Sequence, residues 1–317
     1  MIAMRRGDAH ALRLLLAGAM LALGGAACAS PSDATEPDSE QGDDALVGGQ
    51  AATLGQFPAT VYLKSGCTAT KVAPKRLLTA AHCVLDPATV SIRFPKGSKI
   101  SVTRDPAKGY VDVEIADALV HPTWLKACED AYCAASSVTA RLDAADVAVL
   151  ELATDLDDVP VAPVAAAPLA AGERVTVLGY GCTVGVLVPD DRAAISLKYA
   201  ETTLVPADRA VHDGSAVLAS DVAQVAGIYS LTAGPGAAKA NAGLCPGDSG
   251  GPLYAKRDGA LVVVGVNSNY TLGPEANDEV GLPITNWHTR LDDASRHSVA
   301  AWLRSVGVPT IPPPSAN

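Results

Sequence analysis

Three short segments of this sequence carry side chains that together could hydrolyse an acyl bond. His82 lies in residues 78–84 (LTAAHCV), Asp146 directly precedes an apolar run, and Ser249 lies in residues 245–253 (CPGDSGGPL). A serine hydroxyl is a weak nucleophile unless a base lies within hydrogen-bond reach and a third group orients that base. His82 could be the base and Asp146 the orienting group, so the three residues indicate catalysis by Ser249.

Glycines surround Ser249 and would allow a tight turn. The N–H groups of such a turn can converge on one point, as an oxyanion hole requires. The alternative is the G-x-S-x-G elbow of α/β-hydrolases, which Gly247, Ser249 and Gly251 also satisfy. That elbow needs a helix after the serine and a histidine downstream of it. The Gly-Gly-Pro that follows Ser249 is a poor helix start, and His82 lies upstream, so the alternative is disfavoured.

The elements that would position these residues are mainly short strands. From residue 46 onward, turn-forming residues separate short β-branched runs at 59–63, 91–94, 110–115, 147–152, 174–178 and 261–266. This pattern predicts an antiparallel all-β sandwich or barrel. In residues 298–306 (SVAAWLRSV), the apolar side chains recur at helical spacing. We therefore expect a single terminal helix on a β body. Residues 153–172, with three prolines, predict a surface connector between two halves.

The TAAHC and GDSGGPL strings, in the order His, Asp, Ser, resemble those of trypsin-like (chymotrypsin-fold) serine proteases. The resemblance covers residues 46 to about 305. It implies an all-β fold of two six-stranded antiparallel β-barrels with a C-terminal helix. Residues 46–165 would form the first barrel and residues 166–317 the second barrel with the helix, together one peptidase domain.

The resemblance also implies a mechanism for cleaving protein or peptide substrates. Ser249 would attack the scissile carbonyl, His82 would shuttle the proton, and Asp146 would orient the imidazole. The N–H groups of Gly247 and Ser249 would bind the oxyanion. Asp143 does not directly precede the strand, as the family's acid does, and is expected in a solvated turn. The alternative is a non-catalytic homologue that acts as a surface binding module, although all three residues are present here.

Residues 46–49 (LVGG) resemble the mature N-terminus of this family. In the family, a freed α-ammonium, here that of Leu46, pairs with the acid before the nucleophile, here Asp248. This implies a zymogen and an activating protease that cuts after Ala45. Ala45 is not basic, so a trypsin-like activator would not cut there. The alternative is that residues 46–49 merely start a strand.

The cysteine count is odd, at seven. By resemblance, Cys67 and Cys83 form the disulfide beside the catalytic histidine. Four residues separate Cys128 from Cys133, and we expect these two to pair within a surface insertion. Cys28 lies in the N-terminal leader and drops out of the disulfide count, which leaves Cys182 and Cys245, whose segments line one rim in the family. Their pairing would depart from the family scheme, in which a downstream cysteine bonds the equivalent of Cys245.

Four residues are expected at the specificity pocket. The family reads specificity six positions before the nucleophile, which is Gly243 here rather than an aspartate. Ser268 and Tyr270 match the pocket wall, and Asn286 is placed near the pocket base. These residues imply a shallow, uncharged pocket for small or medium apolar side chains, not for Arg or Lys. If Tyr270 rotated away, the pocket would be more open.

Residues 1–27 read as an export signal, with a basic start, an apolar run at 14–23 and small residues after it. The apolar run is too short to span a bilayer as a helix. The alternative is a buried N-terminal helix. Cys28 follows Gly-Ala-Ala, which resembles the cleavage box of bacterial lipoproteins, so Cys28 would be lipidated. The alternative is ordinary cleavage after Ala29, which would discard Cys28. We therefore expect an exported protein, secreted or lipid-anchored to the bacterial cell envelope.

Residues 28–45 are expected to form an acidic tether or propeptide. Residues 30–45 contain six acidic side chains, no basic side chain and no bulky apolar side chain. Such a segment cannot bury enough apolar surface to become ordered. The formal charge of the whole chain is −10. This charge argues against nucleic acid as the main partner. There is no Cys/His cluster with zinc spacing and no Asp-rich calcium loop, so neither a metal nor another cofactor is implied.

Overall fold

The computed structural model describes residues 46, 49–86, 88–130, 143–181, 195–212, 215–234, 243–272 and 284–313. The chain divides into two units, Met1–Gln41 and Gly42–Asn317, and all described residues belong to the second unit. The expected export signal (1–27), Cys28 and the acidic segment (28–45) lie outside the described residues. No helix in the described part of the chain is long and apolar enough to cross a membrane.

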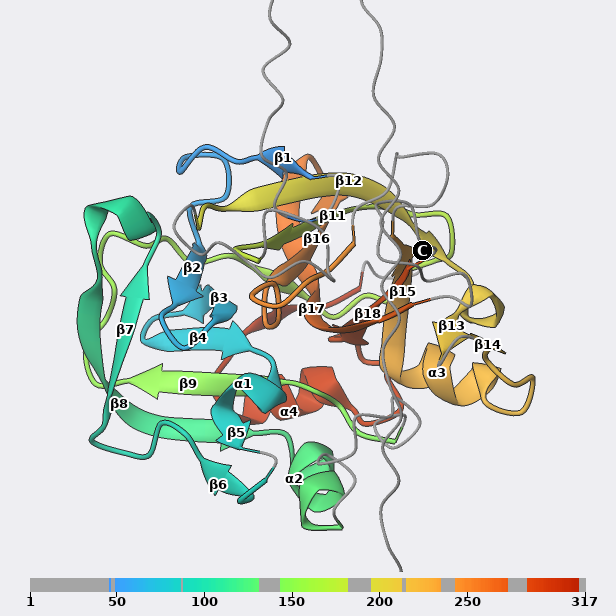
Figure 1. Cartoon of the computed structure of the whole chain (residues 1–317), viewed down its shortest axis with the longest axis horizontal. Coiled ribbons are helices and arrows are strands. Elements are labelled where there is room, and N and C mark those ends of the chain that lie inside the picture. Colours follow the sequence, from blue (N-terminus) through green and yellow to red (C-terminus); the bar gives the residue numbers. More distant parts are fainter. Residues whose placement is uncertain are drawn as a thin grey trace, which may run out of the picture. The chain divides into compact units, whose positions relative to one another are not determined.

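The first barrel is a closed ring of six strands (Figure 1). Its order is β2 (Thr60–Leu63), β3 (Cys67–Ala73), β4 (Arg76–Thr79), β9 (Ala148–Leu152), β8 (Val111–Val120) and β7 (Lys99–Thr103). All neighbouring pairs are antiparallel. Closure pairs the strand edges with one another, which removes sites for aggregation.

The second barrel is also a ring of six antiparallel strands. Its order is β11 (Arg174–Gly179), β12 (Lys198–Val205), β15 (Tyr229–Ala233), β18 (Ile284–Arg290), β17 (Ala260–Leu272) and β16 (Pro252–Arg257). Pairing of β16 with both β17 and β11 closes this ring. The prediction of an all-β fold with two six-stranded antiparallel barrels is therefore confirmed, and each of the six β-branched runs contributes to a strand.

Shorter strands extend or decorate the barrels. β1 (Gln50–Ala51) pairs with β12, and β10 (Val164–Ala165) runs parallel to both β17 and β19 (Thr310–Ile311). Two small antiparallel pairs are β5 (Leu85–Asp86) with β6 (Ser91–Ile92), and β13 (Val211–His212) with β14 (Ser215–Ala216). Two short 3₁₀ helices are η1 (Pro106–Lys108) and η5 (Ala207–Arg209).

The expectation of a single helix was wrong. The terminal helix is present as α4 (Val299–Ser305), and it buries Val299, Ala300 and Leu303. The structure adds α1 (Ala81–Val84), α2 (Pro122–Glu129) and α3 (Val222–Ile228). The eight-residue α2 buries two side chains, and the seven-residue α3 also buries two. Helices this short and this little buried leave no clear helical period in the sequence.

Residues 153–172 connect the two barrels as expected, and ten of these twenty residues are exposed, but part of the segment is buried and bound to the first barrel. Leu156, Val159 and Ala162 are each at most 6% exposed, and both residues of β10 are buried. The N–H of Ala162 donates to Lys71 O (2.8 Å), and Lys71 Nζ donates to Leu156 O (2.7 Å). A proline removes its own N–H donor and fixes its own φ, but the residues beside it keep their N–H groups. The three prolines therefore do not prevent their neighbours from binding the barrel.

Each terminal segment packs on the barrel that is more distant in sequence. β1 near the start pairs with β12 of the second barrel. Near the end, Val299 and Leu303 of α4 belong to the hydrophobic cluster that contains the first barrel. Arg76 of β4 also donates from Nε to Val306 O at 2.8 Å. These contacts join the two barrels into one structural unit.

Candidate active site

His82 and Asp146 are brought together by the pairing of two strands of the first barrel. His82 lies on α1, just after β4, and Asp146 lies just before β9. Thr79 at the end of β4 pairs with Ala148 at the start of β9, so the two side chains extend from neighbouring strand ends. His82 Nδ1 lies 2.7 Å from Asp146 Oδ2, and the His82 N–H donates to Asp146 Oδ1 at 3.0 Å.

The second barrel also holds Asp146, whose side chain is fully buried. Ser268 on β17 donates from Oγ to Asp146 Oδ2 at 2.6 Å, and Thr289 on β18 donates to the Asp146 carbonyl at 3.0 Å. A buried carboxylate is costly unless it is hydrogen-bonded, and the Ser268 hydroxyl, the His82 N–H and His82 Nδ1 compensate this one. An ionised Asp146 only accepts, so His82 carries its proton on Nδ1 and keeps Nε2 as the basic atom.

Ser249 lies in the same place, on the turn before β16. It is partly exposed and lines a cavity of about 270 Å³ together with His82. Among the described residues, no hydrogen bond joins Ser249 Oγ to His82 Nε2. Catalytic hydrogen bonds are often long without substrate and shorten in the complex. The structure thus brings the three residues together, with the His82–Asp146 hydrogen bond formed and the Ser249–His82 hydrogen bond not formed.

The turn around Ser249 leaves two backbone donors available. Gly247 has a φ of 108° and Gly250 a φ of 82°, which favour glycine. A Cβ on Gly247 would lie 2.8 Å from the Cα of Gly181. Within the described part of the chain, the N–H groups of Gly247 and Ser249 have no acceptor. Two unused donors on one turn are what an oxyanion hole requires.

Asp248 is completely buried beside this turn. Its Oδ1 accepts from Gly181 N–H (2.8 Å) and its Oδ2 from Cys245 N–H (2.9 Å). Burial raises the pKa of Asp248 from 3.8 to about 7, although these two hydrogen bonds oppose the shift. Among the described residues, no cationic side chain forms an ion pair with Asp248.

Leu46 is also completely buried, in the hydrophobic cluster of the second barrel. Its neighbours in this cluster include Val175 and Leu244. The Leu46 carbonyl accepts from the Gly49 N–H at 2.5 Å. In the full-length chain Leu46 carries a peptide N–H, and only cleavage after Ala45 would convert it to an ammonium group.

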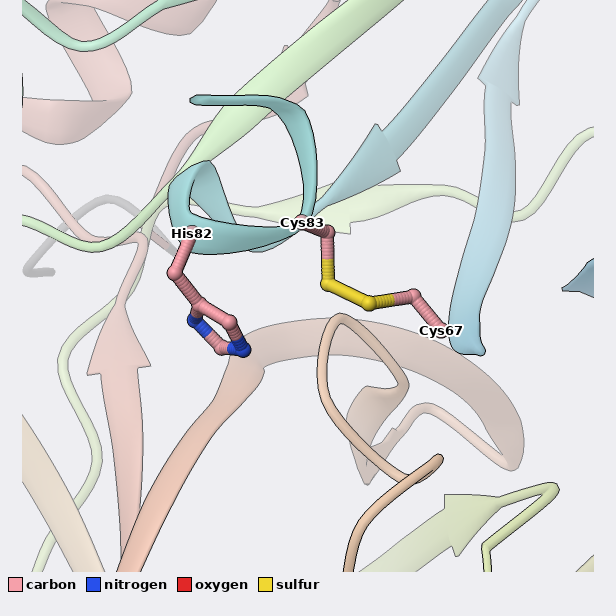
Figure 2. A group of neighbouring side chains, drawn as sticks. All are labelled: Cys67, His82 and Cys83. Carbon is pink, nitrogen blue, oxygen red and sulfur yellow. A yellow bond between two sulfur atoms is a disulfide. The ribbon is translucent and has the colours of Figure 1, made fainter. Parts of the chain in front are cut away.

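The Cys67–Cys83 disulfide is confirmed and lies beside the His82 side chain (Figure 2). The ligand atoms of Cys67, His82 and Cys83 lie within 4.8 Å of one another. Because the two sulfur atoms are bonded to each other, they offer no thiolate to a metal. Cys128 and Cys245 are also disulfide-bonded. Their expected partners, Cys133 and Cys182, lie outside the described residues, so those two pairings stay predictions.

The four residues expected at the specificity pocket separate into two groups. Ser268 and Tyr270 line the cavity that contains Ser249 and His82. Gly243 is buried and does not line it, and Asn286 is fully buried opposite Tyr270 on β18. The cavity is lined further by Leu244, Cys245, Pro246 and Asn269. Among the described residues, no Asp, Glu, Lys or Arg lines it.

Several residues that support the site were not expected from the sequence. Thr68 donates from Oγ1 to Gly247 O at 2.8 Å, and its N–H donates to Ser249 O at 2.8 Å. Thr289 supports Asp146 in a similar way. These threonines lie in ordinary strand sequence without a motif, so no sequence signal distinguished them. Asp143 is exposed as expected, and it pairs with Arg296 at 3.1 Å.

The sequence of this chain is similar to those of known proteins. The trypsin family model matches residues 46–287, which is more than half of the chain. This chain belongs to the trypsin family. A curated relative, chymotrypsin-like elastase family member 1 of Bos taurus, is 27% identical over 236 residues, which cover 70% of this chain and 78% of that protein. The resemblance to trypsin-like, chymotrypsin-fold serine proteases is therefore confirmed for this trypsin-family chain.

Proposed function

We propose that this chain is a serine endopeptidase that uses Ser249 as nucleophile, His82 as general base and Asp146 as the orienting acid. The observation that carries the proposal is the 2.7 Å contact between His82 Nδ1 and the buried Asp146, on a cavity that Ser249 shares. Family membership supports hydrolysis of protein or peptide substrates.

The proposed reaction proceeds in two halves. Ser249 Oγ attacks the scissile carbonyl while its proton moves to His82 Nε2, and Asp146 stabilises the resulting imidazolium. The N–H groups of Gly247 and Ser249 bind the oxyanion. Collapse of the intermediate transfers the proton to the leaving amine and leaves an acyl-enzyme on Ser249. Water, deprotonated by His82, then releases the acid and restores the hydroxyl.

An organophosphonate probe tests the nucleophile directly. The probe should add covalently to Ser249, and Ser249→Ala should abolish the adduct in intact mass spectra. Ser91→Ala, at an exposed strand residue, is the matched control and should label like the wild type. A folded, processed protein that never labels would contradict the proposal and favour a non-catalytic surface binding module.

We further propose that cleavage after Ala45 activates the enzyme. The freed ammonium of Leu46 would pair with Asp248, which is buried with a pKa raised to about 7 and has no cationic side chain as partner among the described residues. An opposite charge would relieve the cost of ionising this carboxylate. N-terminal sequencing of the active form tests this step. An active enzyme that retains residues 30–45 would contradict it.

For specificity, we propose that the enzyme accepts small or medium apolar side chains. Leu244, Pro246 and Tyr270 line the cavity, which carries no acidic side chain among the described residues to select Arg or Lys. Cleavage of a peptide library should show apolar residues before the cut. A strong preference for Arg or Lys would refute the proposal. Gly243 and Asn286 do not line the cavity, so they would affect specificity indirectly, through the lining residues beside them.

The export route is a separate proposal from the sequence. Residues 1–27 would direct export, and Cys28 would be either lipidated or removed by cleavage after Ala29. The mass of the mature N-terminus distinguishes the two routes. A diacylated Cys28 supports a lipid anchor, and an N-terminus at Ser30 supports secretion. Residues 46–165 and 166–317 would then form the exported peptidase domain.

A further inference from the structure

Four buried polar side chains of the second barrel form a chain that the proposed reaction does not use. They come from three neighbouring strands and are all fully buried: Asn267 on β17, His288 and Asn286 on β18, and Thr232 on β15. None of the four lines the cavity that contains Ser249. Fully buried polar groups need partners, so their contacts are informative.

The contacts are continuous from one end to the other. Asn267 Nδ2 donates to Leu178 O (2.7 Å) and Asp248 O (3.1 Å), and Asn267 Oδ1 lies 2.8 Å from His288 Nδ1. His288 Nε2 lies 3.0 Å from Thr232 Oγ1. Beyond Thr232, Asn286 Nδ2 donates to Thr232 Oγ1 at 3.0 Å, and Asn286 Oδ1 accepts from the N–H of Leu244 at 2.8 Å.

The direction of each hydrogen bond follows from its neighbours. Because Asn267 donates from Nδ2, its Oδ1 must accept, and His288 must carry its proton on Nδ1. His288 Nε2 then accepts from the Thr232 hydroxyl, which leaves Thr232 Oγ1 able to accept from Asn286. Burial lowers the pKa of His288 to about 3, so the ring is neutral at neutral pH and this arrangement is stable.

Both ends of the chain hold the loop that carries Ser249. One end binds the Leu244 N–H and the other the Asp248 carbonyl, on either side of the turn. The backbone of Asn267 adds two bonds, since its carbonyl accepts from Gly250 N–H and its N–H donates to Gly251 O, both at 2.8 Å. Hydrogen bonds with Asn267 and Asn286 therefore attach the loop 244–251 to β17 and β18 of the second barrel.

We propose that the Asn267–His288–Thr232–Asn286 chain positions loop 244–251, and with it the Ser249 hydroxyl and the two oxyanion donors. This inference rests on the proposed function of Ser249. The four side chains are positioning residues, because they act on the loop and do not line the cavity. A fully satisfied buried network holds one arrangement, whereas one missing member leaves its neighbours unsatisfied.

Thr232 offers the sharpest test, because among the described residues the hydrogen bonds of its hydroxyl reach the loop only through His288 and Asn286. Thr232→Val removes the hydroxyl but keeps a β-branched side chain, and Thr232→Ser keeps the hydroxyl and is the matched control. Two quantities should be measured on the full-length, processed protein. They are amide hydrogen exchange in residues 244–251 and the rate constant of organophosphonate labelling at Ser249, with kcat and KM determined separately.

In Thr232→Val we expect exchange in the loop to rise and labelling and kcat to fall, each on the order of tenfold, with KM within about twofold. Thr232→Ser should remain close to the wild type in all of these. Loop exchange in Thr232→Val equal to that of the wild type would overturn the proposal. Equal losses in both variants would also overturn it, since the methyl group and not the hydroxyl would then matter.

A second test uses the wild-type protein and measures the tautomer of His288 by NMR. The nitrogen chemical shifts of His288 should report a neutral ring with its proton on Nδ1, and a proton on Nε2 would overturn the chain. If the wild-type protein never labels at Ser249, the proposed function fails by itself. Hydrogen exchange and the His288 tautomer still decide whether the chain holds the loop.

Discussion

At the scale of single residues, Asp146 connects the two barrels at the site. It accepts from His82 of the first barrel and from Ser268 of the second. The carboxylate therefore fixes both the tautomer of His82 and the direction in which Nε2 points. Changes at Asp146 should affect catalysis much more than binding.

Asp146→Asn should preserve the fold but lower kcat on the order of 10⁴-fold, because the amide favours the wrong tautomer of His82. Steady-state kinetics on a peptide substrate measure this loss. Asp143→Asn, three residues earlier and exposed, is the matched control and should leave kcat unchanged. A kcat close to that of the wild type in Asp146→Asn would remove Asp146 from the mechanism.

Asp248 should make the stability of the uncleaved protein depend on pH. Its pKa is raised from 3.8 to about 7 in the folded state, so the folded state binds more protons than the unfolded state between these values. The free energy of unfolding should fall as the pH rises from about 4 to about 7. Urea titrations over this range should show the fall, and Asp248→Asn should flatten it.

Cleavage after Ala45 should remove this pH dependence. An ammonium beside Asp248 would favour the ionised carboxylate and lower its pKa. The fall in stability between pH 4 and 7 should then disappear from the cleaved protein. The same fall in cleaved and uncleaved protein would argue against pairing of Leu46 with Asp248.

At the scale of elements, the Cys67–Cys83 disulfide links the start of β3 to α1. It closes a segment with a sequence separation of 16. Replacing both cysteines by serine should lower the free energy of unfolding by about 3 kcal/mol. Urea denaturation of the double variant and the wild type measures this change. Since α1 carries His82, labelling at Ser249 should also slow.

The motif-bearing elements could be predicted from the sequence, and the less regular ones could not. The apolar run after Asp146 and the glycines around Ser249 are distinctive, so β9 and the turn before β16 were expected. β4 was not among the predicted runs, although it leads directly to His82. The short helix α2 begins at a proline after His121, whose side chain accepts from Thr123 N–H. Such a local cap gives no hydrophobic period to detect.

The Asn267 to Asn286 chain could not be predicted either, for a different reason. Its members come from three strands, and their contacts depend on the register of those strands. β17 and β18 change register between Asn267 and Asn269, which sets the partners of these residues. Register within a barrel depends on packing and bulges, and a single sequence does not specify these.

At the scale of the whole molecule, each barrel depends on residues from the other half of the chain. Val299, Leu303 and Val308, all at most 1% exposed, pack in the cluster that contains the first barrel. The division at residues 165 and 166 separates the barrel strands but not these contacts. We therefore expect residues 46–317 to fold as one cooperative unit.

A fragment of residues 46–165 should consequently fail to form a stable barrel. Without α4, the surface of the first barrel that covers Leu303 would be exposed to water. Circular dichroism and amide exchange of the fragment should show an unfolded or fluctuating state. In the whole chain, Leu303→Ala should lower the free energy of unfolding by about 2–5 kcal/mol. A folded, two-state fragment would contradict this dependence.

The most direct test of the account is the reaction of the processed protein with an organophosphonate probe. We predict one covalent adduct, on Ser249, that is lost in Ser249→Ala and strongly slowed in Asp146→Asn. The contradicting result is a folded protein, cleaved after Ala45, that forms no adduct at Ser249.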